Sequence, residues 1–451
     1  MNHWTLRLIM TAMALLSATT AVAQTPYAQR LEPTGARVEV WLDDAGLPVR
    51  FAEYVQRAQA LIAAHHHAPP PGGWPGLTEP LAQAIGPRQW PMAGADCTPG
   101  NTDGVLLVHG LTDSPYLMRD LGDALASQPL ATGRCTLVRS LLLPGHGTVP
   151  GDLLAVKHTK WTEATRYGVD SFAGEADRVH FVGFSTGGAL GIQRAFAQQN
   201  SASAPALSSL VLLSPAIEPR DRNARRPLVL HWLSWLMNWL DEHDDRDFAK
   251  YESFPLNAGV QIAFLDQALK PLLRAPIPVP VFMAVSRSDD TIAPVASIDV
   301  FLRQTDPRSR MWLVLARDQA ADDDAAWRAR RDQRVNVLDV AELPPQFTTY
   351  AHTSFPVSAL NAHYGTQGPY VNCLHYAPKM KERFEQCISP AMRETMGLAS
   401  VQVGEGRVRY GETVEGKAPN DDWLLRRLTF NPRFDDMLAE IRQFLQTVVA
   451  P

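Results

Sequence analysis

Apolar residues in the middle of the chain gather in six short runs, each about as long as one buried strand. The runs lie at 104–110, 135–147, 179–185, 207–215, 279–290 and 310–318. Apolar residues at helical spacing lie between several of them, as at 116–128 and 187–199. Runs that are apolar on both faces and alternate with helices predict a mostly parallel sheet covered by helices on both sides. The expected fold class is therefore α/β, with the ligand at the carboxyl ends of the strands.

The first hundred residues differ from the rest of the chain in composition and show no such alternation of apolar runs and helices. Residues 1–23 contain one positive charge, an apolar stretch and the small-residue pattern Ala21-Val22-Ala23, which is the layout of a cleavable signal peptide. The alternative is an N-terminal helix that is not cleaved and is either buried or serves as an anchor. Residues 24–100 form an extension rich in Pro, Gly and Ala, and its one predicted helix spans 51–65. The histidines at 65–67 suggest a metal, but consecutive residues point in different directions and no partner lies at ligand spacing, so we predict none.

The rest of the chain, 101–451, is predicted to be one catalytic domain with insertions. The segment at about 215–276, between the fourth and fifth runs, is longer than a connection between two parallel strands needs. It predicts either a buried cap helix or a lid that presents an aromatic surface to an apolar substrate or to a lipid surface. The residues on one face of its helix are Leu228, Trp232, Trp235 and Trp239. Late insertions are expected at about 318–336, as a solvated helical face, and at 373–419, as a surface elaboration. An amphipathic helix at 434–448 closes the chain.

Composition and charge narrow the class of protein. Hydrophobic residues make up 45% of the chain and charged residues 20%, which excludes wholesale disorder. The net charge is -5 and no long basic stretch is present, so nucleic acid is not an expected partner. The even number of cysteines, 4, fits an exported chain with at least one disulfide. Three pairings are open; proximity favours Cys97 with Cys135 and Cys373 with Cys387, because short loops close at lower entropic cost.

A serine lies at the turn between the third apolar run and the helical pattern that follows it. The stretch reads Gly183-Phe184-Ser185-Thr186-Gly187. Strand, Gly-x-Ser-x-Gly and helix form the context of a nucleophile elbow, in which glycines permit a crowded backbone and the helix N-terminus favours negative charge. We predict that Ser185 is a nucleophile.

A serine hydroxyl needs a base and an orienting acid, and in this architecture both follow it, the acid first. Asp289, at the carboxyl end of the fifth run, is the predicted acid, whereas Asp290 better fits a turn-forming or capping role. The histidines downstream of Asp289 are His352, His363 and His375. His352 follows an apolar-aromatic stretch, where a strand would end. It is the predicted base, with His363 as the alternative.

The developing oxyanion needs two backbone N–H donors. Thr186, next after the nucleophile, is expected to supply one. Leu111, in the loop after the first run, is expected to supply the other. His109 then shapes that loop and takes no proton, because the histidines upstream of the nucleophile are in the wrong order for the base.

Five stretches together resemble a known family. They read VLLVHGLTDSPYLMRDLGDALA, RSLLLPGHGTVPGDL, VGFSTGG, SRSDDTI and AHTSFPVS. Over about residues 100–365 the chain is similar to the monoacylglycerol lipase and carboxylesterase branch of the α/β-hydrolase fold, a group that includes serine aminopeptidase-like enzymes. The resemblance implies a catalytic triad and two oxyanion donors. It also implies that LPGHG, which contains His146, is a structural loop beside the site. The triad is Ser185, Asp289 and His352, and the donors are Leu111 and Thr186. The gap of 63 positions between acid and base is longer than compact members have.

The sequence therefore predicts a secreted or periplasmic serine ester hydrolase that forms an acyl-enzyme, acts on a small-molecule or lipid ester and uses no cofactor. One alternative is a serine aminopeptidase-like peptidase, in which the acidic run 241–247 anchors a free amine, although a solvated loop is the simpler interpretation of that run. Another is a non-catalytic binding protein on the same fold, against which the full set of candidate residues argues.

Overall fold

The computed structural model describes most of the chain between residues 28 and 449. The described ranges are 28–69, 73–198, 205–220, 238–316, 324–376, 380–398, 407–412 and 423–449. The predicted signal peptide, 1–23, lies outside them, as does most of the predicted tryptophan-bearing helix of the cap. Among the described residues, no helix has the length and apolar character needed to cross a membrane.

An eight-stranded sheet forms the centre of the molecule, in the order β1-β3-β2-β4-β5-β8-β9-β10. Its strands are β1 (Arg88–Gln89), β2 (Thr102–Val108), β3 (Cys135–Leu141), β4 (Arg178–Phe184), β5 (Ala206–Leu213), β8 (Val281–Ser286), β9 (Arg310–Leu315) and β10 (Val335–Asp339). β1 runs antiparallel to β3, and the other neighbouring pairs of this sheet are parallel. All six predicted strands are confirmed, because continuous apolar runs are what a sheet buried on both faces requires.

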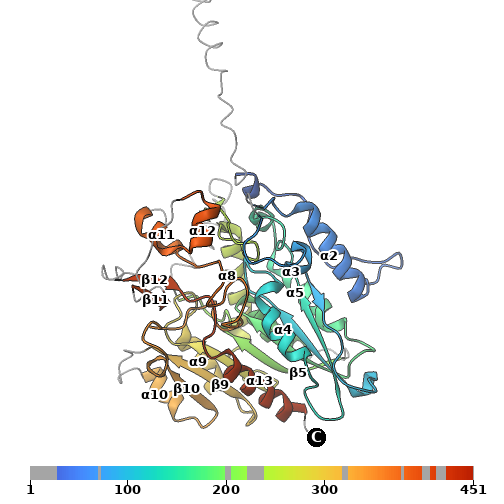
Figure 1. Cartoon of the computed structure of the whole chain (residues 1–451). Coiled ribbons are helices and arrows are strands. Elements are labelled where there is room, and N and C mark those ends of the chain that lie inside the picture. Colours follow the sequence, from blue (N-terminus) through green and yellow to red (C-terminus); the bar gives the residue numbers. More distant parts are fainter. Residues whose placement is uncertain are drawn as a thin grey trace, which may run out of the picture.

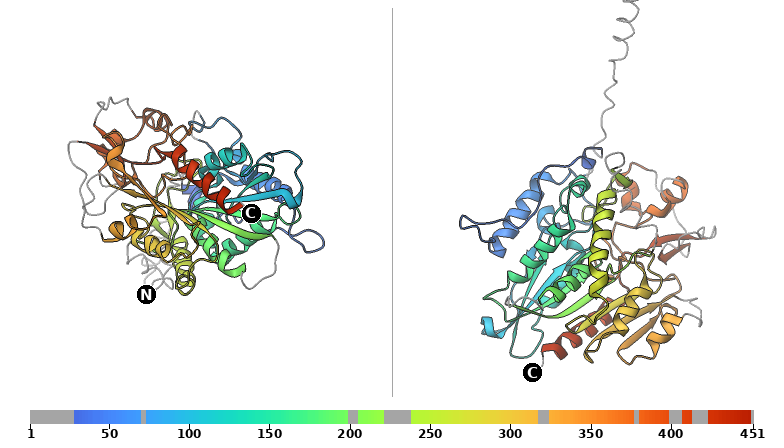
Figure 2. Two further views of the ribbon diagram at one scale, coloured as in Figure 1. Left: turned by 90° about the horizontal axis from the view of Figure 1, so that it is seen from below. Right: turned by 180° about the vertical axis from the view of Figure 1, so that it is seen from behind.

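Helices cover both faces of this sheet, as Figures 1 and 2 show. The helices around the sheet are α2 (Phe51–His65), α3 (Leu81–Ile85), α4 (Arg119–Ala126), α5 (His158–Asp170), α6 (Thr186–Gln198), α8 (Leu256–Leu272), α9 (Pro294–Leu302), α10 (Asp324–Arg330) and α13 (Phe434–Val449). Two short helices, α11 (Lys381–Cys387) and α12 (Pro390–Thr395), belong to the late elaboration (Figure 1). α4 and α13 pack against each other on one face, while α5, α6 and α8 pack together on the other. The α/β class is confirmed, as are the helices expected at 51–65, 187–199 and 434–448.

The N-terminal extension holds more regular structure than the pattern predicted. Besides α2 it contains α3 and the two-residue strand β1, which are too short to leave a periodic signal. The extension also packs against the catalytic body. The Tyr54 hydroxyl of α2 donates to the carbonyl oxygen of Leu142 at 2.9 Å and accepts the N–H of the same residue at 3.2 Å. Tyr54 is fully buried, so α2 covers the end of β3.

Two predicted surface segments are partly built into the fold. The insertion expected at 318–336 reaches into β10, which extends the sheet by pairing with β9. In the cap, β6 (Trp239–Asp241) pairs with β7 (Phe254–Pro255), so Trp239 belongs to a strand and not to the predicted helical face. The other three residues of that face, Leu228, Trp232 and Trp235, lie outside the described residues. The backbone of Trp239 pairs with Pro255, sixteen positions along the chain, and this pairing overrides the helical spacing of Trp239.

The late elaboration carries β11 (Val408–Gly411) and β12 (Leu424–Arg427), which pair in parallel. Disulfides join Cys97 to Cys135 and Cys373 to Cys387, the pairing that proximity favoured. The first ties the N-terminal extension to the start of β3. The second lies within the late elaboration.

Candidate active site

Ser185 lies between the end of β4 and the start of α6, with a left-handed φ of 52°. A non-glycine residue there is strained, and strain of this kind gathers at functional sites. The two flanking glycines are dictated by the close approach of other backbone. A Cβ on Gly187 would lie 2.2 Å from the carbonyl oxygen of Val108, and a Cβ on Gly183 would lie 2.5 Å from the carbonyl carbon of Gly187. The turn therefore admits glycine at both positions and lifts the serine above the sheet.

Three predicted residues come together at this turn through one chain of hydrogen bonds. Ser185 Oγ lies 2.9 Å from His352 Nε2, and His352 Nδ1 lies 2.7 Å from Asp289 Oδ2. A carboxylate only accepts, so Nδ1 carries the proton and Nε2 is free to accept the serine O–H. Asp289 is completely buried and His352 is 5% exposed. The arrangement has the connectivity of a nucleophile, a base and an orienting acid.

The turn after β8 places the second oxygen of Asp289 where it caps the backbone. Asp289 Oδ1 accepts the N–H groups of Thr291 and Ile292 at 2.9 and 3.0 Å. Asp290 instead pairs with Arg427 at 3.2 Å. The prediction that Asp290 is the turn-capping acid is therefore wrong. One carboxylate serves both purposes, because its two oxygens face different partners.

The sequence predicted that His352 lies at the end of a strand, and the structure does not place it there. β10 ends at Asp339, and His352 follows on a long loop. Tertiary bonds fix that loop. Ser286 Oγ donates to the carbonyl oxygen of Tyr350 at 2.9 Å, and the N–H of His352 donates to Glu412 Oε2 at 2.9 Å. Sequence reasoning missed Glu412, because nothing in the sequence around it marks it as close to His352.

The two rival histidines occupy other places. His363 Nε2 lies 3.0 Å from Asp247 Oδ1, and both side chains are buried. His375 borders the same cavity as Ser185. Burial lowers the pKa of His375 to about 4, so its imidazole is neutral at physiological pH. Of the three downstream histidines, His352 is the one whose ring nitrogen lies within hydrogen-bonding distance of the serine hydroxyl.

Two further histidines hold the loop after β2. His109 Nε2 accepts the N–H of Leu143 at 3.0 Å, and His146 Nε2 accepts the N–H of Thr112 at 3.1 Å. Burial lowers the pKa of His146 to about 4 and keeps the pKa of His109 well below its usual range. Both rings are therefore neutral acceptors that fix backbone.

The predicted oxyanion donors, Leu111 and Thr186, border the cavity together with Ser185. Thr186 opens α6, where backbone N–H groups point out of the helix end. Leu111 directly precedes Thr112, whose φ of 65° turns the loop sharply. The N–H of Tyr251, from the cap, donates to the Thr112 carbonyl oxygen at 2.8 Å, so the cap also braces this loop.

The acidic run at 241–247 is solvated only in part: Asp241, Glu242 and Asp244 are exposed, whereas Asp245 and Asp247 are buried. Asp245 is 1% exposed, and its Oδ1 accepts the N–H groups of Glu252 and Ser253 at 2.6 and 2.9 Å. Asp247 is 2% exposed and binds His363 and the Tyr364 hydroxyl. These aspartates are committed to internal bonds, because the cap folds back over the body and buries them.

A cavity of about 690 Å³ lies above Ser185. The cap supplies most of its apolar wall, through Leu240, Phe254, Gly259, Ile262 and Ala263. Acidic side chains also border it, namely Asp113, Glu218, Asp241, Glu252 and Asp266. Asp113 is paired with Lys250 at 3.3 Å. Burial raises the pKa of Glu252 to about 7, so this side chain is partly protonated near neutral pH.

Within the described ranges, one group of residues has metal-ligand chemistry and spacing: Asp289, Asp290 and Glu412. Arg427 lies among them and binds both Asp290 and Glu412. A guanidinium therefore supplies positive charge at this cluster. Burial raises the pKa of Glu412 to about 7, and Arg427 opposes that rise.

The sequence model described as the Alpha/beta hydrolase family matches residues 105–360, more than half of the 451-residue chain. The chain belongs to the alpha/beta hydrolase family. The fold resemblance carried by the five motifs is thereby confirmed. The match spans β2 to the loop beyond His352, so every predicted site residue of this alpha/beta hydrolase lies inside it.

Several solved structures are similar to this chain at low identity and over about half of its length. A structure described under LipS and LipT, two metagenome-derived lipolytic enzymes, has 18% identity and a TM-score of 0.39, and the match covers 50% of this chain and 86% of that one. The monoacylglycerol lipase of Paleococcus ferrophilus has 17% identity and a TM-score of 0.37, with 51% and 88% covered. A monoglyceride lipase variant from Saccharomyces cerevisiae has 13% identity and a TM-score of 0.38, with 51% and 82% covered. No curated protein matches the sequence.

Proposed function

We propose that this alpha/beta hydrolase cleaves carboxylic esters through an acyl-enzyme on Ser185. The observation that supports the proposal is the buried chain of hydrogen bonds from Ser185 Oγ through His352 to Asp289, with distances of 2.9 and 2.7 Å. A serine hydroxyl aligned with an imidazole, which is itself held by a carboxylate, is the arrangement that activates a weak nucleophile.

The reaction follows from this geometry. Ser185 Oγ attacks the ester carbonyl carbon while His352 Nε2 takes its proton, and Asp289 stabilises the imidazolium and keeps Nδ1 oriented. The N–H groups of Leu111 and Thr186 stabilise the charge on the carbonyl oxygen. His352 then protonates the leaving alcohol. In the second half, His352 takes a proton from water, whose oxygen attacks the acyl carbon. His352 then returns that proton to Ser185 Oγ as the acyl–Oγ bond breaks, which releases the acid and regenerates Ser185.

The apolar wall of the cavity favours a substrate with an apolar acyl group, because its burial there removes hydrocarbon from water at about 25 cal/mol per Å². A second candidate function is hydrolysis of an aminoacyl bond. The observation that favours it is Asp241, a carboxylate that borders the cavity with a side chain 63% exposed and can attract a substrate ammonium group. Of the run once expected to anchor that amine, Asp245 and Asp247 are occupied by internal bonds.

Export from the cytoplasm belongs to the same proposal. The predicted leader at 1–23 and the two disulfides support it, because disulfides persist in oxidising compartments. Contact of the cap with a lipid surface is proposed on its apolar residues, of which Leu240 is 47% exposed.

The test combines substrates with a covalent probe. Purified wild type and Ser185→Ala are compared on p-nitrophenyl esters of graded chain length and on aminoacyl anilides, and both are treated with a fluorophosphonate. We expect ester hydrolysis and labelling in the wild type, and a loss of about a million-fold in turnover with no labelling in the variant. Faster cleavage of the anilides would favour the peptidase. Undiminished ester turnover in Ser185→Ala would overturn the mechanism, and a wild type that is inert to every substrate and to the probe would favour a binding protein.

A further inference from the structure

The main chain of the proposed base is held by a side chain from far along the sequence. The N–H of His352 donates to Glu412 Oε2 at 2.9 Å, and Glu412 is 2% exposed. A buried N–H without an acceptor would cost about 1–3 kcal/mol. The position of the imidazole depends on the position of the His352 main chain. A bond that fixes this main chain therefore restrains where the ring lies relative to Ser185.

Glu412 is in turn held on both of its oxygens. Arg427 Nε donates to Oε1 at 2.7 Å, and Arg427 Nη2 donates to Oε2 at 3.2 Å. The same Nη2 lies 3.2 Å from Asp290 Oδ1 and 3.0 Å from Thr291 Oγ1, in the turn that carries Asp289. Arg427 therefore links the turn of the acid to the loop of the base, and a planar guanidinium binds a carboxylate in a defined orientation.

Both residues come from the small sheet of the late elaboration. In the register of β11 and β12, Gly411 is opposite Arg427, so Glu412 directly follows the residue paired with its partner. The N–H of Glu412 donates to Thr349 Oγ1 at 2.6 Å, three positions before the base. The pair is thus tied to the loop it supports at two points.

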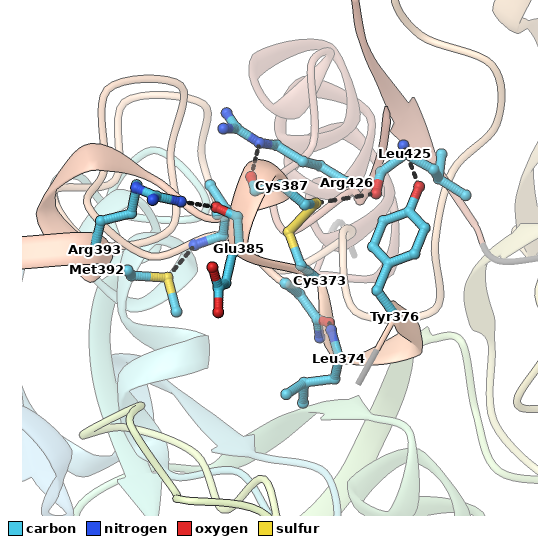
Figure 3. Close-up of a disulfide and its surroundings, with 11 residues drawn as sticks. Cys373, Leu374, Tyr376, Glu385, Cys387, Met392, Arg393, Leu425 and Arg426 are labelled. Carbon is cyan, nitrogen blue, oxygen red and sulfur yellow. Dashed lines mark hydrogen bonds between the residues drawn. A yellow bond between two sulfur atoms is a disulfide. The ribbon is translucent and has the colours of Figure 1, made fainter. Parts of the chain in front are cut away.

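The second disulfide anchors the strand that carries the arginine. Figure 3 shows the Cys373–Cys387 disulfide beside Leu425 and Arg426 of β12, and hydrogen bonds join these residues to the segment that the disulfide closes. Arg426 Nε donates to the carbonyl oxygen of Cys387 at 2.8 Å, and the N–H of Leu425 donates to the Tyr376 hydroxyl at 2.9 Å. A covalent link next to the strand limits how far it can move.

We propose that Glu412 and Arg427 are positioning residues of this hydrolase, which act through the main chain of His352 and the turn of Asp289 to align the imidazole with Ser185. The proposal rests on the function proposed above. It assigns the late elaboration a part in catalysis. A misplacement of about 1 Å can cost about 100-fold in rate, so the loss of a bond that holds the base has a measurable effect.

The test separates alignment from folding. Glu412→Leu removes the acceptor, and Glu412→Gln keeps an oxygen that can accept the His352 N–H. The control, Arg334→Met, removes a bidentate arginine–carboxylate contact with Asp332 of similar length, 3.0 and 2.7 Å, directly before β10. Active sites are titrated with a fluorophosphonate, and kcat per titrated site and KM are measured on one ester. We expect Glu412→Leu to lose about 10- to 100-fold in kcat with KM within about threefold, Glu412→Gln to lose less than about 10-fold, and Arg334→Met to keep the wild-type kcat.

A purely structural role would lower the melting temperature and the titrated fraction but leave kcat per site unchanged, and that result in Glu412→Leu would overturn the proposal. An equal loss of kcat in Arg334→Met would also overturn it. Should Glu412→Leu not fold, Arg427→Met takes its place, with an expected loss of at least about 10-fold in kcat, and an unchanged kcat there refutes the inference. Ser185→Ala is measured in parallel, because its activity tests the proposed mechanism separately.

Discussion

Two buried histidines of this hydrolase form a matched pair that distinguishes catalysis from stability. His352 lies 2.7 Å from Asp289, and His363 lies 3.0 Å from Asp247, all four side chains being buried. A serine hydroxyl lies 2.9 Å from the free nitrogen of His352. Substitution of each histidine by alanine therefore removes a similar bond and should have opposite consequences.

His352→Ala should lower kcat by about a million-fold, close to the loss for Ser185→Ala, because members of a triad act as a unit. At 1.36 kcal/mol for each tenfold change, this loss is about 8 kcal/mol in activation free energy. The double variant should be scarcely slower than either single one, because the base has no role without the nucleophile.

His363→Ala should cost stability instead. Asp247 would lose one of its bonds but keep those from the Tyr364 hydroxyl at 2.6 Å and the N–H of Ala249 at 2.9 Å. Breaking a buried pair lowers the free energy of unfolding by about 3–5 kcal/mol. Because Asp247 keeps two hydrogen bonds, we expect a loss near the lower limit of this range. We expect a lower melting temperature with kcat per folded site within about threefold of wild type.

The assay is initial rates on one p-nitrophenyl ester, normalised to folded protein by circular dichroism, together with thermal melts of both variants. The reasoning would be refuted by a folded His363→Ala that is inactive beside a His352→Ala that turns over normally. That outcome would move the base eleven positions along the chain.

Three other predictions follow from single contacts. Asp289→Asn should lower kcat by about 10⁴-fold through the wrong imidazole tautomer, whereas Asp290→Asn should change kcat by less than about tenfold, as steady-state rates on the same ester would show. Replacing Cys97 and Cys135 by alanine opens a loop of 38 residues and should lower the unfolding free energy by about 4 kcal/mol in urea titrations; an unchanged midpoint would contradict this. Burial raises the pKa of Glu252 from 4.5 to about 7, so the folded protein holds this proton more tightly than the unfolded chain does. Its stabilising contribution is full below about pH 4.5 and is lost as the pH rises to about 7, and Glu252→Gln should remove that part of the pH slope of the melting temperature.

The sequence by itself determined the features that depend on local pattern. The six apolar runs became buried strands, because a strand buried on both faces must be apolar at every position. The elbow at Ser185 was predicted because Gly-x-Ser-x-Gly stands between an apolar run and a helical pattern, although the crowding that requires Gly187 comes from Val108 on β2. Asp289 was predicted from its place at the end of a strand, because the carboxyl ends of parallel strands meet at one edge of the sheet.

The tertiary structure alone decided which distant residues meet on loops. The local pattern favoured His352 over His363 because a strand was expected to end there, yet His352 follows no strand. The two histidines differ by what the folded loop brings near each ring. The acidic run seemed solvated because charge is usually exposed, yet Asp245 and Asp247 are buried by partners that no local signal announces.

Glu412 is the clearest case of a residue that the sequence could not predict. It lies 60 positions from His352, in a segment that looked like surface elaboration, and its contact with the base depends on the pairing of β11 with β12. A strand or an elbow is specified by neighbours along the chain. A contact between two loops is specified by the path of everything between them, so it exists only once the chain has folded.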